Sequence, residues 1–240
     1  MCGITGFIDF ESTLTGEVLH DMLSTLHHRG PDDEGIDIFQ TNHSRIGLAQ
    51  KRLSIIDLSP LGHQPMIFQN LKVVFNGEIY NYKEIRRELE EQQYTFTSGS
   101  DTEVILKAYH KWGIESINKF IGMFAIVIFD ELRDEVVLIR DRAGVKPLYW
   151  YKSNRAILFS SELKSFHACG HFKAEVDINA LAQYFKFGYI PAPYSIYKET
   201  SKVRPGHYIR ISLKSREIRE NTYWDVQSFY NRPKLKVSFH

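Results

Sequence analysis

Phe124-Ala125-Ile126-Val127-Ile128-Phe129 and, after a short charged connection, Val136-Val137-Leu138-Ile139 give the strongest structural signal in this 240-residue chain. Both runs are rich in β-branched and aromatic residues, which predicts strands over Met123–Phe129 and Glu135–Ile139. Their connection is too short for a parallel crossover, so the two strands are antiparallel neighbours. Neither run alternates apolar with polar residues, as a strand with one wet face would. Both faces of this sheet are therefore predicted to be covered.

The segments on either side come as runs of strands and pairs of helices. Further strands are predicted from Gly3 onward, at 36–40, 45–48, 71–75, 148–151 and 157–160, and as a closing hairpin of 207–212 with 217–224. Helices are predicted over about 16–27, after Asn81, after Ser100 or Asp101 with a buried stripe that ends at Trp112, and around Leu181, Tyr184 and Phe185. This order predicts an α+β fold, a four-layer αββα sandwich of two mainly antiparallel sheets with helices outside.

The composition excludes several classes of protein. A formal net charge of +1 gives no electrostatic signal for nucleic acid. The longest apolar run, Phe120–Phe129, is too short to span a bilayer, and no membrane association is expected. The two cysteines, Cys2 and Cys169, cannot form a disulfide framework, so we expect a cytoplasmic protein in which Cys169 is an ordinary structural thiol. The ten histidines show no metal-ligand spacing, and no metal site is predicted.

Cys2 directly follows the initiator methionine, and this position gives it unusual chemistry. Methionine aminopeptidases remove Met1 when the second residue is small, which leaves a thiol and a free α-amine on one residue. The reference pKa is about 8.5 for the thiol and about 7.7–8.0 for an α-amine, so one residue supplies both nucleophile and base. Gly3 leaves room for a substrate, and the strand that follows holds the terminus in place. The alternative is that position 2 merely tolerates a small residue.

Three other segments each have a functional and a structural interpretation. Asn76-Gly77, where strand 71–75 is expected to break, offers a side-chain NH₂ and an unobstructed backbone N–H, the donors of an oxyanion hole, but is also a strong turn signal. Asp101 either caps a helix or binds a ligand ammonium. Arg52 either clamps a carboxylate or forms a surface ion pair. Segment 140–147 lacks the glycine spacing of a phosphate loop and is interpreted as a structural connection with internal ion pairs.

Together these segments resemble the glutaminase domain of class II glutamine amidotransferases, which are N-terminal-nucleophile hydrolases. The resemblance covers roughly residues 2–225 and rests on motifs in the family's order: Cys2-Gly3-Ile4, His28-Arg29-Gly30-Pro31-Asp32, Arg52-Leu53-Ser54-Ile55, Asn76-Gly77-Glu78-Ile79-Tyr80-Asn81, Ser98-Gly99-Ser100-Asp101-Thr102-Glu103, Arg140-Asp141-Arg142, Gly144, Lys146-Pro147-Leu148-Tyr149 and Ser161-Glu162-Leu163-Lys164. Within the family, the proline and aspartate at positions 31 and 32 resemble the sequence that the asparagine synthetase branch has after His-Arg-Gly. The resemblance implies the N-terminal-nucleophile hydrolase fold.

The resemblance also implies a role for each candidate residue. Cys2, freed of Met1, would attack the side-chain amide of L-glutamine, and Asn76 with the Gly77 N–H would hold the oxyanion. Arg52 would bind the substrate α-carboxylate, and Asp101, helped by Glu78, the α-ammonium. Backbone groups at three further positions would complete the pocket: Leu53, Ile55 and Ile56. Ammonia would leave and water would hydrolyse the thioester to glutamate.

The resemblance ends where a synthetase domain should follow. Residues 2–225 are predicted to be a glutamine amidotransferase type 2 domain, and 226–240 a basic tail that starts the linker to an absent synthetase domain. ATP and magnesium are expected only in that absent domain, so no cofactor is predicted for this chain. The expected partners are glutamine and a synthetase domain or subunit that receives the ammonia; a homodimer stays open. Two alternatives remain: a domain that serves an acceptor other than aspartate, and a catalytically silent domain that binds a synthetase partner.

Overall fold

Two six-stranded sheets form the centre of the protein in the computed structural model, which describes residues 1–231. The order is β10-β8-β9-β1-β3-β2 in the first sheet and β12-β11-β7-β6-β5-β4 in the second, and every described strand pair is antiparallel. The strands are β1 (Gly3–Asp9), β2 (Asp33–Gln40), β3 (Arg45–Arg52), β4 (Met66–Phe68), β5 (Leu71–Ile79), β6 (Gly122–Asp130), β7 (Glu135–Arg140), β8 (Tyr149–Lys152), β9 (Ala156–Ser160), β10 (Thr200–Lys202), β11 (His207–Ser212) and β12 (Ile218–Thr222).

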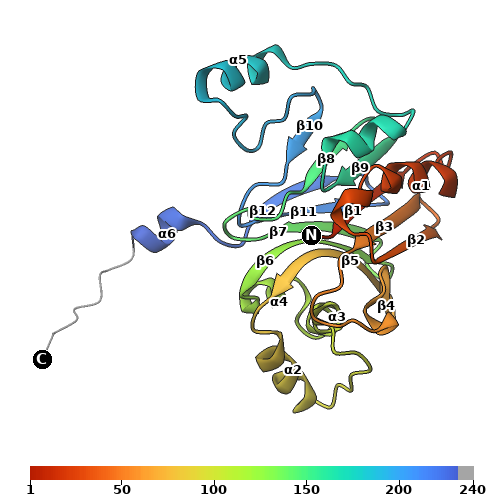
Figure 1. Ribbon diagram of the computed structural model, residues 1–240, viewed down its shortest axis with the longest axis vertical. Coiled ribbons are helices and arrows are strands. Elements are labelled where there is room, and N and C mark those ends of the chain that lie inside the picture. The colour runs from red at the N-terminus through yellow and green to blue at the C-terminus, as the bar shows by residue number, and fades with distance from the viewer. Residues whose placement is uncertain (232–240) are drawn as a thin grey trace, which may run out of the picture.

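The helices lie outside the sheets (Figure 1). They are α1 (Gly16–Ser24), α2 (Tyr82–Glu90), α3 (Asp101–Trp112), α4 (Ser116–Lys119), α5 (Ile178–Phe187) and α6 (Val226–Tyr230), with 3₁₀ turns at His27–Arg29, Pro60–Gly62, Gly113–Glu115 and Leu163–Ala168. In Figure 1, α2, α3 and α4 gather below the second sheet, while α5 stands apart at the top and α6 lies to the left. None of the helices in the described part of the chain is long and apolar enough to cross a bilayer.

Three apolar clusters separate four layers. The middle cluster lies between the sheets and joins Ile4 and Ile8 of β1 to Val127 and Leu138 of the second sheet. A second cluster packs the other face of the second sheet against α2 and α3, and a third packs the first sheet against α1. The predicted α+β sandwich of two antiparallel sheets with helices outside is therefore confirmed.

The apolar runs of β6 and β7 do not alternate with polar residues, because both faces of these strands are covered. Ile126 and Ile128 belong to the cluster on the helix side, whereas Val127 and Phe129 belong to the cluster between the sheets. Successive side chains of a strand point to opposite faces, so each face of β6 needs an apolar residue. The prediction that both faces are covered is confirmed by this division.

The expected strand break at Asn76-Gly77 is wrong. β5 continues to Ile79, with Asn76 opposite Ala125 and Gly77 opposite Phe124 of β6. A Cβ at Gly77 would lie 2.1 Å from the carbonyl oxygen of Met123, so only glycine fits this rung. Long-range pairing with β6 thus overrides the local turn signal.

Two local expectations need correction, and the choice between Ser100 and Asp101 as a helix cap is decided. The first helix ends at Ser24, with a 3₁₀ turn after it, and not at His27. Asn81 occupies the N-cap position of α2, but its side chain accepts from Ile121 N (2.9 Å) and donates to Lys119 O (3.0 Å) instead of capping. Ser100, whose hydroxyl accepts from Thr102 N at 3.2 Å, is the cap of α3.

The connection after β7 is held by backbone hydrogen bonds where internal ion pairs were expected. The Asp141 carboxylate accepts from four backbone N–H groups, those of Phe124, Ala143, Val145 and Lys146. Arg140 donates to the carbonyls of Gly144, Lys146 and Val203. These hydrogen bonds hold the backbone of the loop and so position the Cα of Lys146.

Candidate active site

Cys2 lies at the mouth of the space between the sheets. It precedes β1, and the register of β1 with β3 pairs Gly3 with Lys51, which brings Cys2 beside the end of β3 at Arg52. Alternate residues of a strand share a face, so Cys2 follows Ile4, and Arg52 follows Leu48, on the face that meets the second sheet. The Leu53 N–H lies 3.4 Å from the Cys2 sulfur and donates to it.

Asn76 faces the same space from the second sheet. It shares a strand face with Val74, which belongs to the cluster between the sheets. Its side chain is 1% exposed, and neither Nδ2 nor Oδ1 has a hydrogen-bond partner. Leaving a buried amide unpaired costs about 1–3 kcal/mol, so such a group is expected where a ligand supplies the partner.

Gly77 lines the same cavity, and its N–H is placed by the pairing of β5. N–H groups two residues apart in a strand face the same edge. On one side of Gly77, Phe75 N donates to Gln64 Oε1 at 2.7 Å, and on the other, Ile79 N donates to Asp101 Oδ2 at 3.0 Å. The Gly77 N–H lies between these two donors on the edge of β5 away from β6.

Arg52 is buried, at 8% exposure, and has no ion pair within residues 1–231, so the surface ion-pair alternative is wrong. Its guanidinium donates to the backbone carbonyls of Asp57 and Ser59, the second at 3.1 Å. Asp57 in turn accepts from Gly99 N at 2.9 Å, and the Ser59 hydroxyl and N–H lower the pKa of its carboxyl. Arg52 therefore holds the loop 53–59 over the site, and no carboxylate among the described residues lies at ion-pair distance from it.

Asp101 is a buried carboxylate with no cationic partner among the described residues. It is 5% exposed at the first turn of α3. Burial, followed by the charge of Glu78, raises the pKa of Asp101 to about 6, against hydrogen bonds from Ile79 and the α3 N-terminus that lower it. Its Oδ2 accepts from Ile79 N, so Asp101 is not the α3 cap but is fixed beside β5.

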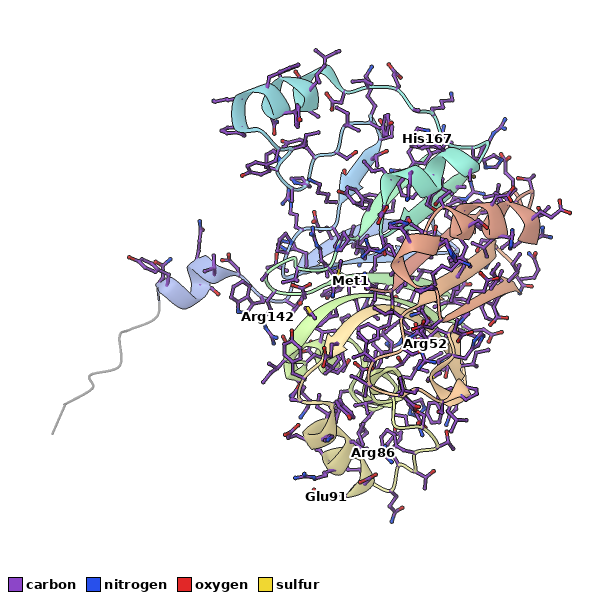
Figure 2. The ribbon with its side chains drawn as sticks, viewed as in Figure 1. Met1, Arg52, Arg86, Glu91, Arg142 and His167 are labelled. Carbon is purple, nitrogen blue, oxygen red and sulfur yellow. The ribbon has the colours of Figure 1, made fainter. Side chains whose placement is uncertain are left out.

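All of the candidate residues predicted from the sequence line one cavity. Figure 2 shows Met1 and Arg52 in the central part of the molecule, away from α5. The cavity is lined by all nine candidates, Cys2, Arg52, Leu53, Ile55, Ile56, Asn76, Gly77, Glu78 and Asp101, together with Met1, Gln50, Gln64 and Lys146 among others. A thiol, two amide-type donors, a carboxylate and a guanidinium thus surround one space. Such a set suits an α-amino acid whose side chain carries a carbonyl.

The cavity also sets the proton affinity of the nucleophile. Burial raises the pKa of the Cys2 thiol, and the nearby Asp101 carboxylate adds to this. The Leu53 N–H, the N-terminal ammonium and Arg52 act in the opposite direction. The thiol therefore depends on neighbouring donors and cations to ionise.

The comparison with known families agrees with this chemistry. The profile of the glutamine amidotransferase domain family matches residues 1–224. The chain belongs to this family.

Two relatives of this amidotransferase domain are named as synthetases. The putative asparagine synthetase [glutamine-hydrolyzing] 2 of Methanocaldococcus jannaschii is 40% identical over 256 residues, covering 98% of this chain and 49% of the relative. Asparagine synthetase [glutamine-hydrolyzing] 3 of Bacillus subtilis is 36% identical over 235 residues, covering 95% and 37%. The chain thus spans half or less of the length of these relatives.

A solved structure shares the fold of the amidotransferase domain. The glutamine phosphoribosylpyrophosphate amidotransferase of B. subtilis superposes with a TM-score of 0.68 at 21% identity, covering 93% of this chain and 49% of that one. At this identity the likeness concerns the fold alone.

Sequence reasoning missed part of the amidotransferase site. Arg29 Nε donates to the Cys2 carbonyl at 2.9 Å, and its Nη1 contacts Glu162 Oε1 at 2.7 Å. Glu162 also contacts His28 Nε2 at 2.9 Å. These residues stand in the quoted motifs, but no local pattern shows that they meet across more than a hundred residues. Lys146 was assigned to a structural loop, yet its side chain lines the cavity.

Proposed function

We propose that the chain hydrolyses L-glutamine to glutamate and ammonia through a thioester on Cys2 after removal of Met1. Met1 is 60% exposed at the mouth of the site, which suits access by a processing enzyme. Its loss turns the Cys2 amide nitrogen into an α-amine. The observation that carries the proposal is the buried Asn76 amide, whose two polar atoms lack partners inside the cavity that also holds Cys2.

In the first half-reaction the α-amine takes the thiol proton and the sulfur attacks the side-chain carbonyl carbon of glutamine. The oxyanion that forms is held by Asn76 Nδ2 and the Gly77 N–H, and one such donor contributes about 3–4 kcal/mol in the transition state. The α-ammonium then gives its proton to the leaving nitrogen, which departs as ammonia. In the second half-reaction water attacks the thioester, glutamate leaves and the thiol is restored.

Substrate selection follows from the ends of the cavity. Arg52, which has no ion pair among residues 1–231, would hold the α-carboxylate, and Asp101, next to Glu78, the α-ammonium. Leu53, Ile55 and Ile56 would close the pocket from the loop that Arg52 holds. An amide that lacks these charged groups leaves buried Asp101 and Arg52 unpaired, which explains selection against it.

We further propose that the ammonia passes to an ATP-dependent synthetase part, as the names of the relatives suggest, and that the reaction takes place in the cytoplasm. ATP and magnesium would act only in that part, so the hydrolysis of glutamine by this chain needs neither. EDTA is then expected to leave the rate of glutamate release unchanged.

The test is glutamate release by purified protein whose intact mass shows that Met1 is absent. Hydrolysis of glutamine is expected, with loss of activity in Cys2→Ala and full activity in Cys169→Ala, because Cys169 is 2% exposed and packs in the cluster under α1. Processed, folded protein that releases no glutamate would support the silent-domain alternative instead.

A further inference from the structure

Lys146 is a buried cation at the active site to which the proposed chemistry gives no task. It is 5% exposed, and its side chain lines the cavity that holds Cys2. No carboxylate within residues 1–231 lies at ion-pair distance from it, and the contact that its Nζ makes is with the sulfur of Met1, at 3.4 Å. Burying an unpaired ammonium is costly, so its retention needs a cause.

The backbone of Lys146 is fixed in a way that aims the side chain at the N-terminus. Its N–H donates to Asp141 Oδ2 at 2.9 Å, and its carbonyl accepts from Arg140 Nε at 2.9 Å. The contact with Met1 shows that Nζ reaches the residue directly before Cys2. Loss of Met1 would remove this neighbour and leave the Cys2 α-amine as the new end of the chain.

We propose that Lys146 is the electrostatic partner of the processed Cys2, a cation that favours the free α-amine and the thiolate at neutral pH. Two cations at close range disfavour each other, so the α-ammonium is destabilised beside Lys146, and the thiolate is stabilised. The inference rests on the proposed removal of Met1. It gives the self-assisted nucleophile the positive charge that a buried thiol needs in order to ionise.

Other charged groups face this pair and set the balance. Burial and Arg29 lower the pKa of Lys146, while Cys2, Asp141 and Glu78 raise it. Arg52 lowers the pKa of the Cys2 thiol and Asp101 raises it. None of these groups forms an ion pair with Lys146 among the described residues, and the side chain of Lys146 lines the cavity that holds Cys2.

The test is the pH dependence of Cys2 alkylation by iodoacetamide in the processed protein, with the modified residue identified by peptide mass spectrometry. Lys146→Met removes the charge at similar length, and Lys146→Gln supplies a second neutral side chain in case the first variant folds poorly. Lys146→Arg keeps the charge. Lys152→Met, on the exposed residue at the end of β8, is the matched control for removal of a lysine elsewhere.

The neutral variants are expected to raise the apparent midpoint of alkylation by about one pH unit, because a neighbouring charge shifts a pKa by about 1–3 units. The midpoint belongs to the coupled thiol and amine and not to either alone. Lys146→Arg and Lys152→Met should superpose on the parent. An unchanged or lowered midpoint in folded Lys146→Met or Lys146→Gln would overturn the inference. Failure of the parent to hydrolyse glutamine would overturn the proposed function but leave this alkylation result interpretable.

Discussion

Asp101→Asn is predicted to stabilise the fold at neutral pH while abolishing glutamine binding. The carboxyl is 5% exposed and its pKa rises from 3.8 to about 6, mainly through burial. A raised carboxyl pKa means that the ionised form costs the folded state free energy. That cost is absent below pH 3.8, grows between 3.8 and 6, and is complete above 6. A shift of about two units corresponds to about 3 kcal/mol at pH 7.5 and about 1.5 kcal/mol at pH 5.

Asparagine removes this cost and keeps the local contact. Its side-chain oxygen still accepts from Ile79 N, which Asp101 Oδ2 does at 3.0 Å. The hydrogen bond from Ile79 N lowers the pKa of Asp101, so the value of about 6 already includes its charge-assisted strength. The net gain in the free energy of unfolding is therefore about 3 kcal/mol at pH 7.5 and about 1.5 kcal/mol at pH 5.

Urea unfolding of Asp101→Asn and the parent at both pH values measures this gain. In a Cys2→Ala background, which cannot consume glutamine, saturating ligand at about a hundred times its dissociation constant should add about 2.7 kcal/mol to the parent and nothing to the Asp101→Asn variant. A variant that loses stability as the pH rises from 5 to 7.5 relative to the parent, or that glutamine still stabilises, would refute the assignment of Asp101 as an unpaired carboxylate that awaits an ammonium.

Three further predictions concern the cavity and the residues that hold Cys2 beside it. Asn76→Ala should lower kcat by about 10²–10³-fold with little change in KM, because it removes an oxyanion donor. Thermal stability should change little, because the two buried amide atoms that are removed have no partners in the free protein. A rise in KM as large as the fall in kcat would argue for ground-state binding instead. The KM for glutamine should rise as the pH falls through about 6, since protonated Asp101 no longer attracts the ammonium, and a KM that stays flat from pH 7 to 5 would contradict this. Glu162→Gln should reduce kcat/KM about tenfold by loosening Arg29, which holds the Cys2 carbonyl, because a hydrogen bond between charged groups contributes about 1.5 kcal/mol. Glu175→Gln, at the exposed partner of Lys198, is the control and should leave kcat/KM unchanged.

The four layers of the fold could be predicted from the sequence because they follow from connection lengths and from the pattern of apolar residues within single strands. The short connection between β6 and β7 requires an antiparallel pair, and residues such as Ile126 and Val127 then need two apolar environments. The prediction that was wrong, a strand break at Asn76-Gly77, also rested on local sequence. Asn76-Gly77 has the composition of a turn, yet β6 pairs with it and the strand continues, since pairing along a whole strand outweighs one turn preference.

The candidate site was predicted from the order of motifs, and there is a physical reason why the sequence did not predict all of its residues. Arg52 and Asp101 could be nominated because each stands at the end of an element. The contact of Arg29 with Cys2 and the entry of Lys146 into the cavity depend on how distant segments pack, which no periodicity reports. The ion pairs expected in segment 140–147 were wrong because Asp141 satisfies backbone N–H groups and not the neighbouring arginines.

The most direct test uses a diazoketone analogue of glutamine, which alkylates the nucleophile that would attack the amide carbon. Processed protein is incubated with the analogue, and its intact mass and N-terminal peptide are measured by mass spectrometry. We expect one adduct per chain, on the sulfur of Cys2 in protein that has lost one methionine, with protection by glutamine. An adduct on another residue, or equal labelling and activity in protein that retains Met1, would contradict a nucleophile that depends on its own α-amine.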